Sequence, residues 1–413
     1  MSYKIAFLTD LHVSEDRLNE NKASFVSALR VLKEASPTLI VIGGDLCGYR
    51  VPHRPTPAER RLLHTFLSRC AALAPVRVVR GNHDSIGEFD WLNWAASDIE
   101  YHEAPGLIEA AGLNVVVLPW IDRGLVAATD PAAQTDDDVY TAHVVRTYRD
   151  HVAAAVENGR PFLIAAHAAV GGGHVRTGQP AVPSSDPTVP ASVLAPDVPE
   201  WIGTVCGHYH APQVVLRRDA RGVYYGGSMS VSEYGEDPYK GVLLIGPEGA
   251  EVKRLWTRRR IGLLYDLEGQ TLTVSGHDLD KTLTLSGSAE EIAAAIAAVP
   301  APTWRQAPPP GGTDRSLGVR ARLTVCARGA VDATAVAIVR EALSTHLAGE
   351  GAEIAPVAYR VEAVRREREG AEEVRSATTN GDRLAAWIRT NAASFPYAQE
   401  AAAALAEIEQ ELQ

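Results

Sequence analysis

The stretch Val76–Asp84, with the sequence VRVVRGNHD, joins a short apolar run to a turn that carries three polar side chains. The β-branched residues of Val76–Arg80 predict a buried strand, and Gly81 permits the tight turn that follows it. In open α/β sheets the carboxyl ends of the strands border the crevice in which ligands bind. The tripeptide Asn82-His83-Asp84 therefore holds candidate functional groups.

Four other predicted strands end in the same way, each in a short motif of polar side chains. Aspartate, asparagine and histidine are side chains that hold divalent manganese, iron, magnesium or zinc. A single motif of this kind is usually an ordinary polar strand end, whereas five in succession predict one metal centre assembled from distant segments. The four further motifs are Thr9-Asp10-Leu11-His12, Gly43-Gly44-Asp45, Ala166-His167 and Cys206-Gly207-His208-Tyr209-His210.

Two of the motifs place metal-binding side chains two residues apart. Residues i and i+2 of an extended segment face the same side, so we expect Asp10 and His12 to reach one ion. The same geometry applies to His208 and His210, although a turn there would divide them between two ions.

The first half of the chain alternates β-branched runs with helical patterns, which indicates a layered α/β architecture. From residue 213 the pattern changes to strand, turn, strand, which predicts a second sheet packed against the first. We expect one domain over residues 1–258, a smaller α+β domain over 259–364, and a charged linker with C-terminal helices over 365–413. The predicted strands of the first half are Lys4–Leu8, Leu39–Ile42, Val76–Arg80, Asn114–Leu118, Phe162–Ala165 and Gly203–Cys206, and the predicted helices are Lys22–Glu34 and Pro57–Ala74.

The composition argues against several classes of protein. The chain has 413 residues and a net charge of -11, which disfavours sequence-independent adhesion to nucleic acid by bulk electrostatics. It has no apolar run of 18 residues and no signal peptide before the first motif, so we expect a cytoplasmic protein without a membrane span. The cysteines at positions 47, 70, 206 and 326 are isolated, which argues against disulfides and a structural zinc site.

The order DxH, GD, GNHD, H and GHxH resembles the calcineurin-like metallophosphoesterase superfamily over residues 3–257. Within it, the segment between GD and GNHD resembles SbcD-type DNA repair nuclease subunits. So does the run Val223–Val242, which contains Gly227-Ser228, Glu233-Tyr234-Gly235-Glu236 and Lys240-Gly241. The resemblance implies a four-layer α/β/β/α sandwich with a smaller α+β capping domain and C-terminal helices.

The resemblance also implies a role for each motif residue. Seven of them would hold two divalent ions, with Asp45 shared between the two. The other ligands would be Asp10, His12 and His210 for the first ion, and Asn82, His167 and His208 for the second. His83, oriented by Asp84, would contact the scissile phosphate and help stabilise charge or protonate the leaving oxygen. Manganese is the expected metal, with magnesium, iron or zinc as alternatives, and the expected chemistry is in-line attack of a metal-activated water on a phosphodiester.

The SbcD-type resemblance implies that the substrate is DNA. The chain would be the exonuclease and endonuclease subunit of a double-strand-break repair or recombination complex, and its partner would be an SbcC-like ATPase of the SMC family. A homodimer is expected, with Pro57–Ala74 and Phe89–Ala96 as candidate contact segments. The C-terminal apolar stripe of Leu405, Ile408 and Leu412 either docks on the ATPase or packs on its own chain.

Two other functions compete with this interpretation. The first is a stand-alone phosphodiesterase that acts on a cyclic nucleotide or another small phosphodiester with the same metals. The second is a scaffold with a vestigial metal centre, which the complete set of ligand positions argues against.

One departure from the family pattern follows Gly44-Asp45-Leu46. Family members often carry an aromatic residue and then Asp or His at this point, whereas this chain has Cys47-Gly48. A side chain there helps to position a DNA end, so the balance between exonuclease and endonuclease activity stays open. His53 and Arg54 are the candidate substitutes for binding substrate.

Overall fold

The computed structural model describes residues 3–48, 54–95, 98–175, 185–232, 234–236, 240–255, 259–275, 283–299, 319–328, 330–348 and 353–362. Within these residues the strands form three six-stranded sheets and one two-stranded pair.

The first sheet has the strand order β14-β13-β1-β2-β3-β4. The strands β1 to β4 run parallel, and β13 pairs antiparallel with β1, with Ile5 opposite Ile245. All residues of β1, β2 and β3 are buried, as expected for parallel strands covered on both faces. The bounds are β1 Ile5–Leu8, β2 Leu39–Ile42, β3 Val76–Val79, β4 Ile99–His102, β13 Gly241–Gly246 and β14 Gly249–Arg254.

The second sheet has the order β11-β12-β10-β7-β6-β5. Its four central strands run parallel, and the edge strands β5 and β11 are antiparallel to their neighbours. The bounds are β5 Gly106–Ala110, β6 Leu113–Leu118, β7 Phe162–His167, β10 Trp201–Gly207, β11 Gln213–Arg218 and β12 Arg221–Tyr225.

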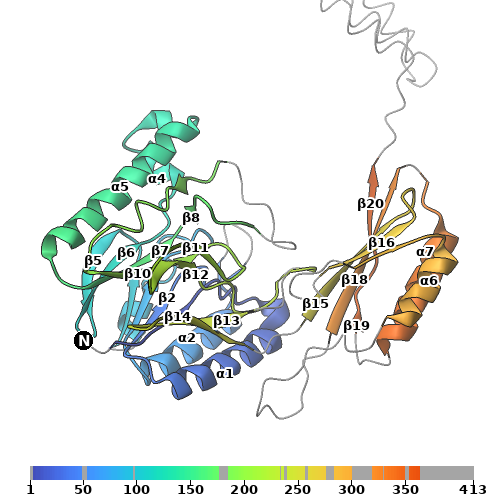
Figure 1. Cartoon of the computed structure of the whole chain (residues 1–413), viewed down its shortest axis with the longest axis horizontal. Helices are drawn as coiled ribbons and strands as arrows, with labels where there is room; N and C mark the ends of the chain where they lie inside the picture. The colour runs from blue at the N-terminus through green and yellow to red at the C-terminus, as the bar shows by residue number, and fades with distance from the viewer. Residues whose placement is uncertain are drawn as a thin grey trace, which may run out of the picture. The chain divides into compact units, whose positions relative to one another are not determined.

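The two sheets pack face to face, with helices on their outer sides (Figure 1). The core between them includes Phe7 of β1 and Val205 of β10. On one outer side α1 (Leu18–Ala35) and α2 (Pro57–Ala71) cover the first sheet, and on the other α5 (Asp137–Asn158) covers the second. The predicted four-layer α/β/β/α sandwich is thereby confirmed. Shorter elements are η1 Glu15–Arg17, α3 Leu92–Ala95, α4 Arg123–Ala127, η2 Pro131–Gln134, β8 Ala169–Val170 and β9 Thr188–Val189.

Local sequence explains where the long helices begin and end. Thr56 and Glu59 form a capping box at the start of α2, where Pro57 occupies the first helical position. Asp136 caps α5, and Gly159 ends it in the left-handed conformation. The buried side of α5 recurs at three- and four-residue intervals, which places its apolar stripe on the second sheet.

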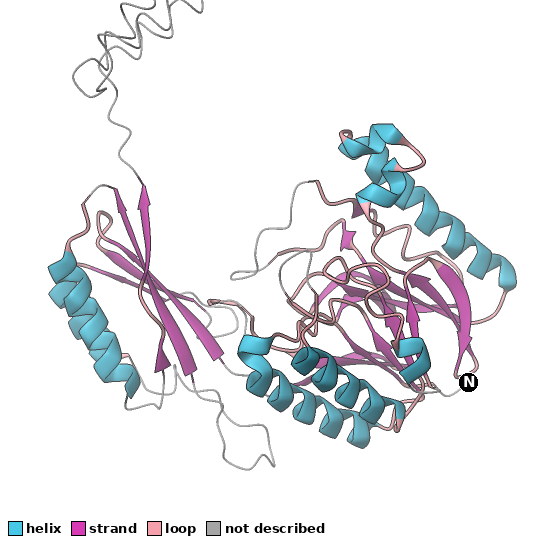
Figure 2. Cartoon of the chain, turned by 180° about the vertical axis from the view of Figure 1, so that it is seen from behind, coloured by secondary structure: helices cyan, strands magenta, loops and turns pink. Residues whose placement is uncertain are grey.

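Beyond β14 the chain forms an α+β part with its own sheet, in the order β17-β16-β15-β18-β19, with β20 beside β18. The helices α6 and α7 pack together on one face of this sheet (Figure 2). Its elements are β15 Arg259–Asp266, β16 Thr271–Ser275, β17 Leu283–Ser286, α6 Ala289–Ala298, β18 Val319–Arg328, α7 Ala333–Ala348, β19 Glu353–Ile354 and β20 Ala358–Glu362.

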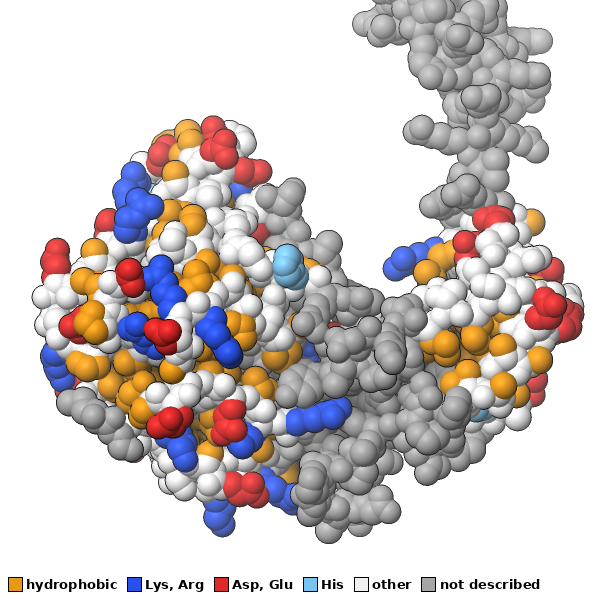
Figure 3. Space-filling model, viewed as in Figure 1, with side chains coloured by type: hydrophobic (Ala, Val, Ile, Leu, Met, Phe, Trp, Pro, Cys, Tyr) orange, Lys and Arg blue, Asp and Glu red, His pale blue; other side chains and the backbone are white. Residues whose placement is uncertain are grey.

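Three further features bear on the predictions. The C-terminal segment 365–413 lies outside the described residues, so its predicted helices stay predictions. Among the described helices, none combines the length and apolar character that a membrane span requires. On the face of the sandwich drawn in Figure 3, acidic and basic side chains are interspersed rather than gathered by sign.

Candidate metal centre

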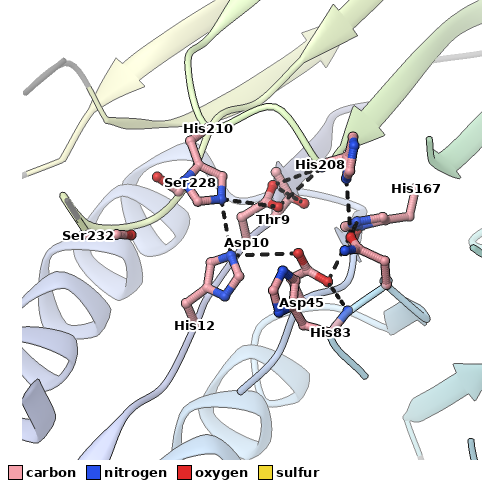
Figure 4. A network of polar contacts seen from close by, with 12 residues as sticks. Thr9, Asp10, His12, Asp45, His83, His167, His208, His210, Ser228 and Ser232 are labelled. Carbon is pink, nitrogen blue, oxygen red and sulfur yellow. Dashed lines mark hydrogen bonds and ion pairs between the residues drawn. The ribbon is translucent and has the colours of Figure 1, made fainter. Parts of the chain in front are cut away.

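The five sequence motifs meet at one place, and strands of both sheets lead into it (Figure 4). The ends of β1, β2 and β3 in the first sheet and of β7 and β10 in the second lead directly into them. The side chains brought together are those of Asp10, His12, Asp45, Asn82, His83, His167, His208 and His210.

Four of these residues have a backbone in the left-handed region, which non-glycine residues seldom adopt. The φ angle is 51° at Asp10, 43° at His12, 52° at Asp45 and 101° at His208. Such conformations cost about 1–3 kcal/mol each and concentrate at functional sites. These backbone conformations also correct the sequence-based explanation of how Asp10 and His12 come together. Asp10 and His12 converge through left-handed turns after β1, not through alternation along an extended strand.

Gly81 and Gly44 are required by the close packing around Asp45. A Cβ atom on Gly81 would lie 2.1 Å from Oδ1 of Asp45. Gly44 has a φ of 93°, and a Cβ atom there would lie 2.8 Å from Nδ1 of His167. The two glycines therefore allow the motif loops to approach one another closely.

Asp10, His12 and His210 form the first group, and their potential ligand atoms lie within 4.8 Å of one another. Nδ1 of His12 donates to the carbonyl oxygen of Gly48 at 2.5 Å, so Nε2 carries no hydrogen and its lone pair is available. This Nε2 lies 3.1 Å from Nε2 of His210, whose Nδ1 faces the Glu236 carboxylate at 3.4 Å. Two ring nitrogens so placed need either a hydrogen or a metal ion between them.

Asp45 lies between this group and a second one. Its Oδ2 is 3.6 Å from Nε2 of His12, and its Oδ1 is 3.6 Å from Nε2 of His167. Oδ1 also accepts a hydrogen bond of 2.9 Å from the backbone N–H of His83. Because its two oxygens point toward different histidines, the carboxylate is arranged to be shared between two ions.

The second group gathers around Asn82. Nδ1 of His167 donates to the carbonyl oxygen of Gly43 at 2.6 Å, so its Nε2 turns inward and lies 2.9 Å from Oδ1 of Asn82. Nδ1 of His208 lies 3.1 Å from the same oxygen. His167 is also grouped with Asp10 and Asp45 within 4.8 Å. His208 therefore faces Asn82 while His210 faces His12, which is the division that a turn between them produces.

Asp84, predicted from sequence to orient His83, also binds the backbone of two motif loops. Its carboxylate accepts three backbone N–H bonds, from Asp45 at 2.9 Å, Leu46 at 2.8 Å and Gly81 at 2.8 Å. The buried carboxylate thus joins the GNHD loop to the GD loop and fixes the backbone of Asp45. Orientation of the His83 imidazole by Asp84 stays a prediction.

Exposure separates Asn82 and His83 from the other motif residues. Both are partly exposed, whereas the remaining six side chains of the centre are buried. The imidazole of His83 meets that of His12 edge to face, with 5.2 Å between the ring centroids. The GNHD loop is therefore the side of the centre that solvent reaches.

Several residues that support the centre were not predicted from sequence. Trp120, after β6, stacks on the imidazole of His208 at 5.2 Å, and the carboxylate of Asp186 lies 3.5 Å from Nε2 of that imidazole. Buried Arg80 pairs with Asp122 at 2.6 Å and donates to the Asp84 carbonyl at 3.1 Å. No short motif marks Trp120, Asp122 and Asp186, because their contacts are with residues far away in sequence.

Glu236 and Lys240 form a second unpredicted feature behind His210. Both are buried, and the Lys240 ammonium contacts the Glu236 carboxylate directly. The ammonium also donates to Oγ of Ser228 at 2.8 Å and to the carbonyl oxygen of His210 at 3.0 Å. The family resemblance included these residues but assigned them no role.

The pKa shifts follow from this packing. Burial raises the pKa of Asp10 and raises that of Asp45 to about 7. Burial also lowers the pKa of His12 and His167, which keeps both imidazoles neutral. Burial opposes the protonated form of His210, but the carboxylates of Glu236 and Asp10 outweigh it and raise the pKa. Buried carboxylates and inward-facing neutral imidazoles are the donor set that divalent cations require, so these residues fit two metal ions.

The remaining candidates from sequence lie elsewhere or outside the described residues. His53 is among the residues that the structure does not describe, and Arg54 is exposed. In the candidate dimer segment Leu92 is buried, whereas 82% of the Trp94 side chain is exposed. Substrate binding by His53 and Arg54 and the homodimer stay predictions.

Comparison with solved structures gives several distant likenesses. A dimetal phosphatase from Danio rerio is 12% identical with a TM-score of 0.38, and the match covers 69% of this chain and 99% of that one. The phosphoesterase Yfce from E. coli is 15% identical, with a TM-score of 0.27 and coverage of 68% and 98%. Phosphopantetheinyl hydrolase from Mycobacterium tuberculosis is 16% identical, with a TM-score of 0.31 and coverage of 55% and 90%. TM-scores this low decide neither activity nor substrate.

No curated protein matches the sequence. The family described as calcineurin-like phosphoesterase does match, over residues 3–212, which is more than half of the chain. The matched segment contains all eight residues of the centre. The chain therefore belongs to the calcineurin-like phosphoesterase family and is a metal-dependent hydrolase of phosphate esters.

Proposed function

We propose that the chain is a two-metal phosphodiesterase that cleaves DNA as the nuclease subunit of an SbcCD-type repair or recombination complex. Its metals are manganese ions, its partner is an SbcC-like ATPase, and it works as a homodimer. The observation that carries this proposal is the α+β part built from β15 to β20 with α6 and α7. Hydrolysis of a small ester has no need of this part, whereas an SbcD-type subunit carries a capping domain at the same point in the chain.

In this proposal seven residues of the centre bind the two metal ions and His83 contacts the phosphate. Asp10, His12 and His210 hold one ion and Asn82, His167 and His208 the other, with Asp45 between them. Two divalent ions supply a water of lowered pKa and neutralise charge on the attacking and leaving oxygens. His83 lies on the exposed side, so its imidazole donates a hydrogen bond to the phosphate and holds a proton for the leaving oxygen.

The protein surface agrees with a substrate that is bound locally rather than by bulk charge. The net charge is -11, and the visible face of the sandwich mixes both signs. Metal ions at the centre supply positive charge where the phosphodiester binds. Specific engagement of a DNA end by the centre and the α+β part therefore fits this chain better than coating of a duplex.

A comparison of substrates tests the proposal. Purified protein with Mn²⁺ is offered linear double-stranded DNA, single-stranded DNA and a cyclic nucleotide, with and without the ATPase partner and ATP. His83→Ala reports on activity of this centre, and the matched control is His143→Ala on α5, where Nδ1 of His143 lies 3.4 Å from Nη2 of Arg146. We expect DNA to be cleaved by the wild-type and His143→Ala proteins and not by His83→Ala. Hydrolysis of the cyclic nucleotide with intact DNA would establish the stand-alone phosphodiesterase instead.

A further inference from the structure

The imidazoles of the centre differ in what lies behind them. The second nitrogens of His12 and His167 donate to backbone carbonyl oxygens, those of Gly48 and Gly43. Nδ1 of His210 instead faces a carboxylate, that of Glu236, at 3.4 Å. A carboxylate in this position fixes the ring orientation and makes the opposite nitrogen a stronger donor to a metal ion.

The Glu236 carboxylate is itself held in place from both sides. Oε2 accepts a hydrogen bond of 2.7 Å from the backbone N–H of Ser232. Oε1 contacts the Lys240 ammonium and accepts from Oγ of Ser228 at 3.3 Å. Only 3% of the surface of Glu236 is exposed, so these buried contacts hold its carboxylate in place.

Lys240 completes this arrangement. Its side chain is fully buried, and its ammonium has three acceptors: the Glu236 carboxylate, Oγ of Ser228 at 2.8 Å and the carbonyl oxygen of His210 at 3.0 Å. All three hydrogens of the ammonium are therefore used. The ion pair therefore contacts His210 twice. Lys240 binds its main-chain carbonyl oxygen, and Glu236 faces its ring.

A buried ion pair is a poor way to stabilise a fold. The cost of removing two charges from water often equals or exceeds their attraction, and an apolar pair of similar volume would serve stability as well or better. The Glu236–Lys240 ion pair lies directly behind the candidate metal ligand His210, which points to a role in positioning that ligand. We propose that Glu236 is a positioning residue for His210, that Lys240 holds it there, and that this ion pair sets the affinity of the metal position formed by Asp10, His12 and His210.

The inference concerns the metal centre alone, so it does not depend on DNA being the substrate. The test titrates the full-length protein with Mn²⁺ by calorimetry and by electron paramagnetic resonance. The variant Glu236→Gln/Lys240→Met removes both charges and keeps the approximate volumes, so no charge is left buried alone. Its matched control is Glu251→Gln/Lys253→Met, in the exposed ion pair of β14, where the two charged atoms are 2.7 Å apart.

We expect the wild-type and control proteins to bind two ions. The Glu236→Gln/Lys240→Met variant should bind one ion with wild-type affinity and the other about 10- to 100-fold more weakly. Hydrolysis of bis(p-nitrophenyl) phosphate should fall at low Mn²⁺ and return toward the wild-type rate at high Mn²⁺. Affinities at both positions within threefold of wild type would overturn the proposal and leave the ion pair a structural one.

A second variant guards against a folding defect. Glu236→Asp keeps the charge that Lys240 needs but shortens the side chain by one methylene, so it withdraws the carboxylate from His210. Thermal unfolding of the metal-free proteins should be close to wild type for this variant, while the loss of affinity at one metal position persists. An unfolding temperature that drops with no change in metal affinity would again contradict the positioning role.

Discussion

Nε2 of His12 and Nε2 of His210 lie 3.1 Å apart although they belong to residues 198 positions apart in the sequence. The other nitrogen of each ring is turned toward an acceptor, the Gly48 carbonyl for His12 and the Glu236 carboxylate for His210. The pair is therefore set to share either a hydrogen or a metal ion. In the metal-free protein a hydrogen lies between the two nitrogens, and a metal ion must displace it.

This displacement predicts that metal affinity depends on pH. Burial raises the pKa of Asp45 to about 7, and the Glu236 and Asp10 carboxylates raise the pKa of His210 against the effect of its burial. Asp45 holds a proton below a pH of about 7, the raised pKa of His210 favours its protonated form, and both groups must lose a proton to bind a metal. Affinity for Mn²⁺ should therefore rise with pH and level off above about 8, with a loss of about tenfold or more between pH 8 and pH 6.

Calorimetry in two buffers of different ionisation enthalpy measures both the affinity and the protons released. We expect net proton release at pH 6.5 and little at pH 8.5. An affinity that is flat between pH 6 and pH 8 would mean that neither Asp45 nor His210 is a ligand.

Gly81→Ala should disable the centre through Asp45. The added Cβ atom would lie 2.1 Å from Oδ1 and 2.4 Å from the backbone nitrogen of Asp45, so the shared carboxylate must move. We expect loss of at least one bound Mn²⁺ and a destabilisation of about 1–3 kcal/mol from overpacking. Gly124→Ala is the control, because a Cβ atom on Gly124 meets nothing within 4 Å. Normal metal stoichiometry in Gly81→Ala would show that the loops have more freedom than their packing indicates.

Asp84→Asn should act on the backbone of the centre rather than on His83. One of the two carboxylate oxygens becomes an amide donor, yet both oxygens accept backbone N–H bonds, from Leu46 on one and from Asp45 and Gly81 on the other. At least one buried N–H therefore loses its acceptor. We expect a destabilisation of about 2–4 kcal/mol in chemical denaturation, since hydrogen bonds to charged groups contribute about 1.5–3 kcal/mol each.

The control for this prediction is Asp98→Asn, whose side chain is exposed and should change stability very little. An Asp84→Asn protein of normal stability but altered pH dependence of hydrolysis would instead support the sequence prediction, in which Asp84 orients His83.

Much of the fold was predictable because the signals were local. The strand Leu39–Ile42 has the bounds that its apolar pattern indicated, the helix α2 begins at the predicted Pro57, and the five polar motifs lie at strand ends as expected. The 22-residue helix α5 was missed, because its buried stripe is diluted by alanine and polar residues and only its packing on the second sheet makes it evident. The role of Glu236 was likewise unpredictable, since it depends on contacts with Lys240 and His210 that local sequence does not encode.

His83→Ala should separate catalysis from metal binding. The imidazole is partly exposed on the GNHD loop, and the residue supports Asp45 through its backbone N–H, at 2.9 Å, which alanine retains. The two ions should therefore bind within about threefold of wild-type affinity. Loss of a group that donates to the phosphate and the leaving oxygen should lower kcat about 10²- to 10⁴-fold. His210→Ala, by contrast, should lose an ion, so the two variants differ in metal stoichiometry even if both are inactive. A loss of metal in His83→Ala would make His83 a ligand and remove it from the role of acid.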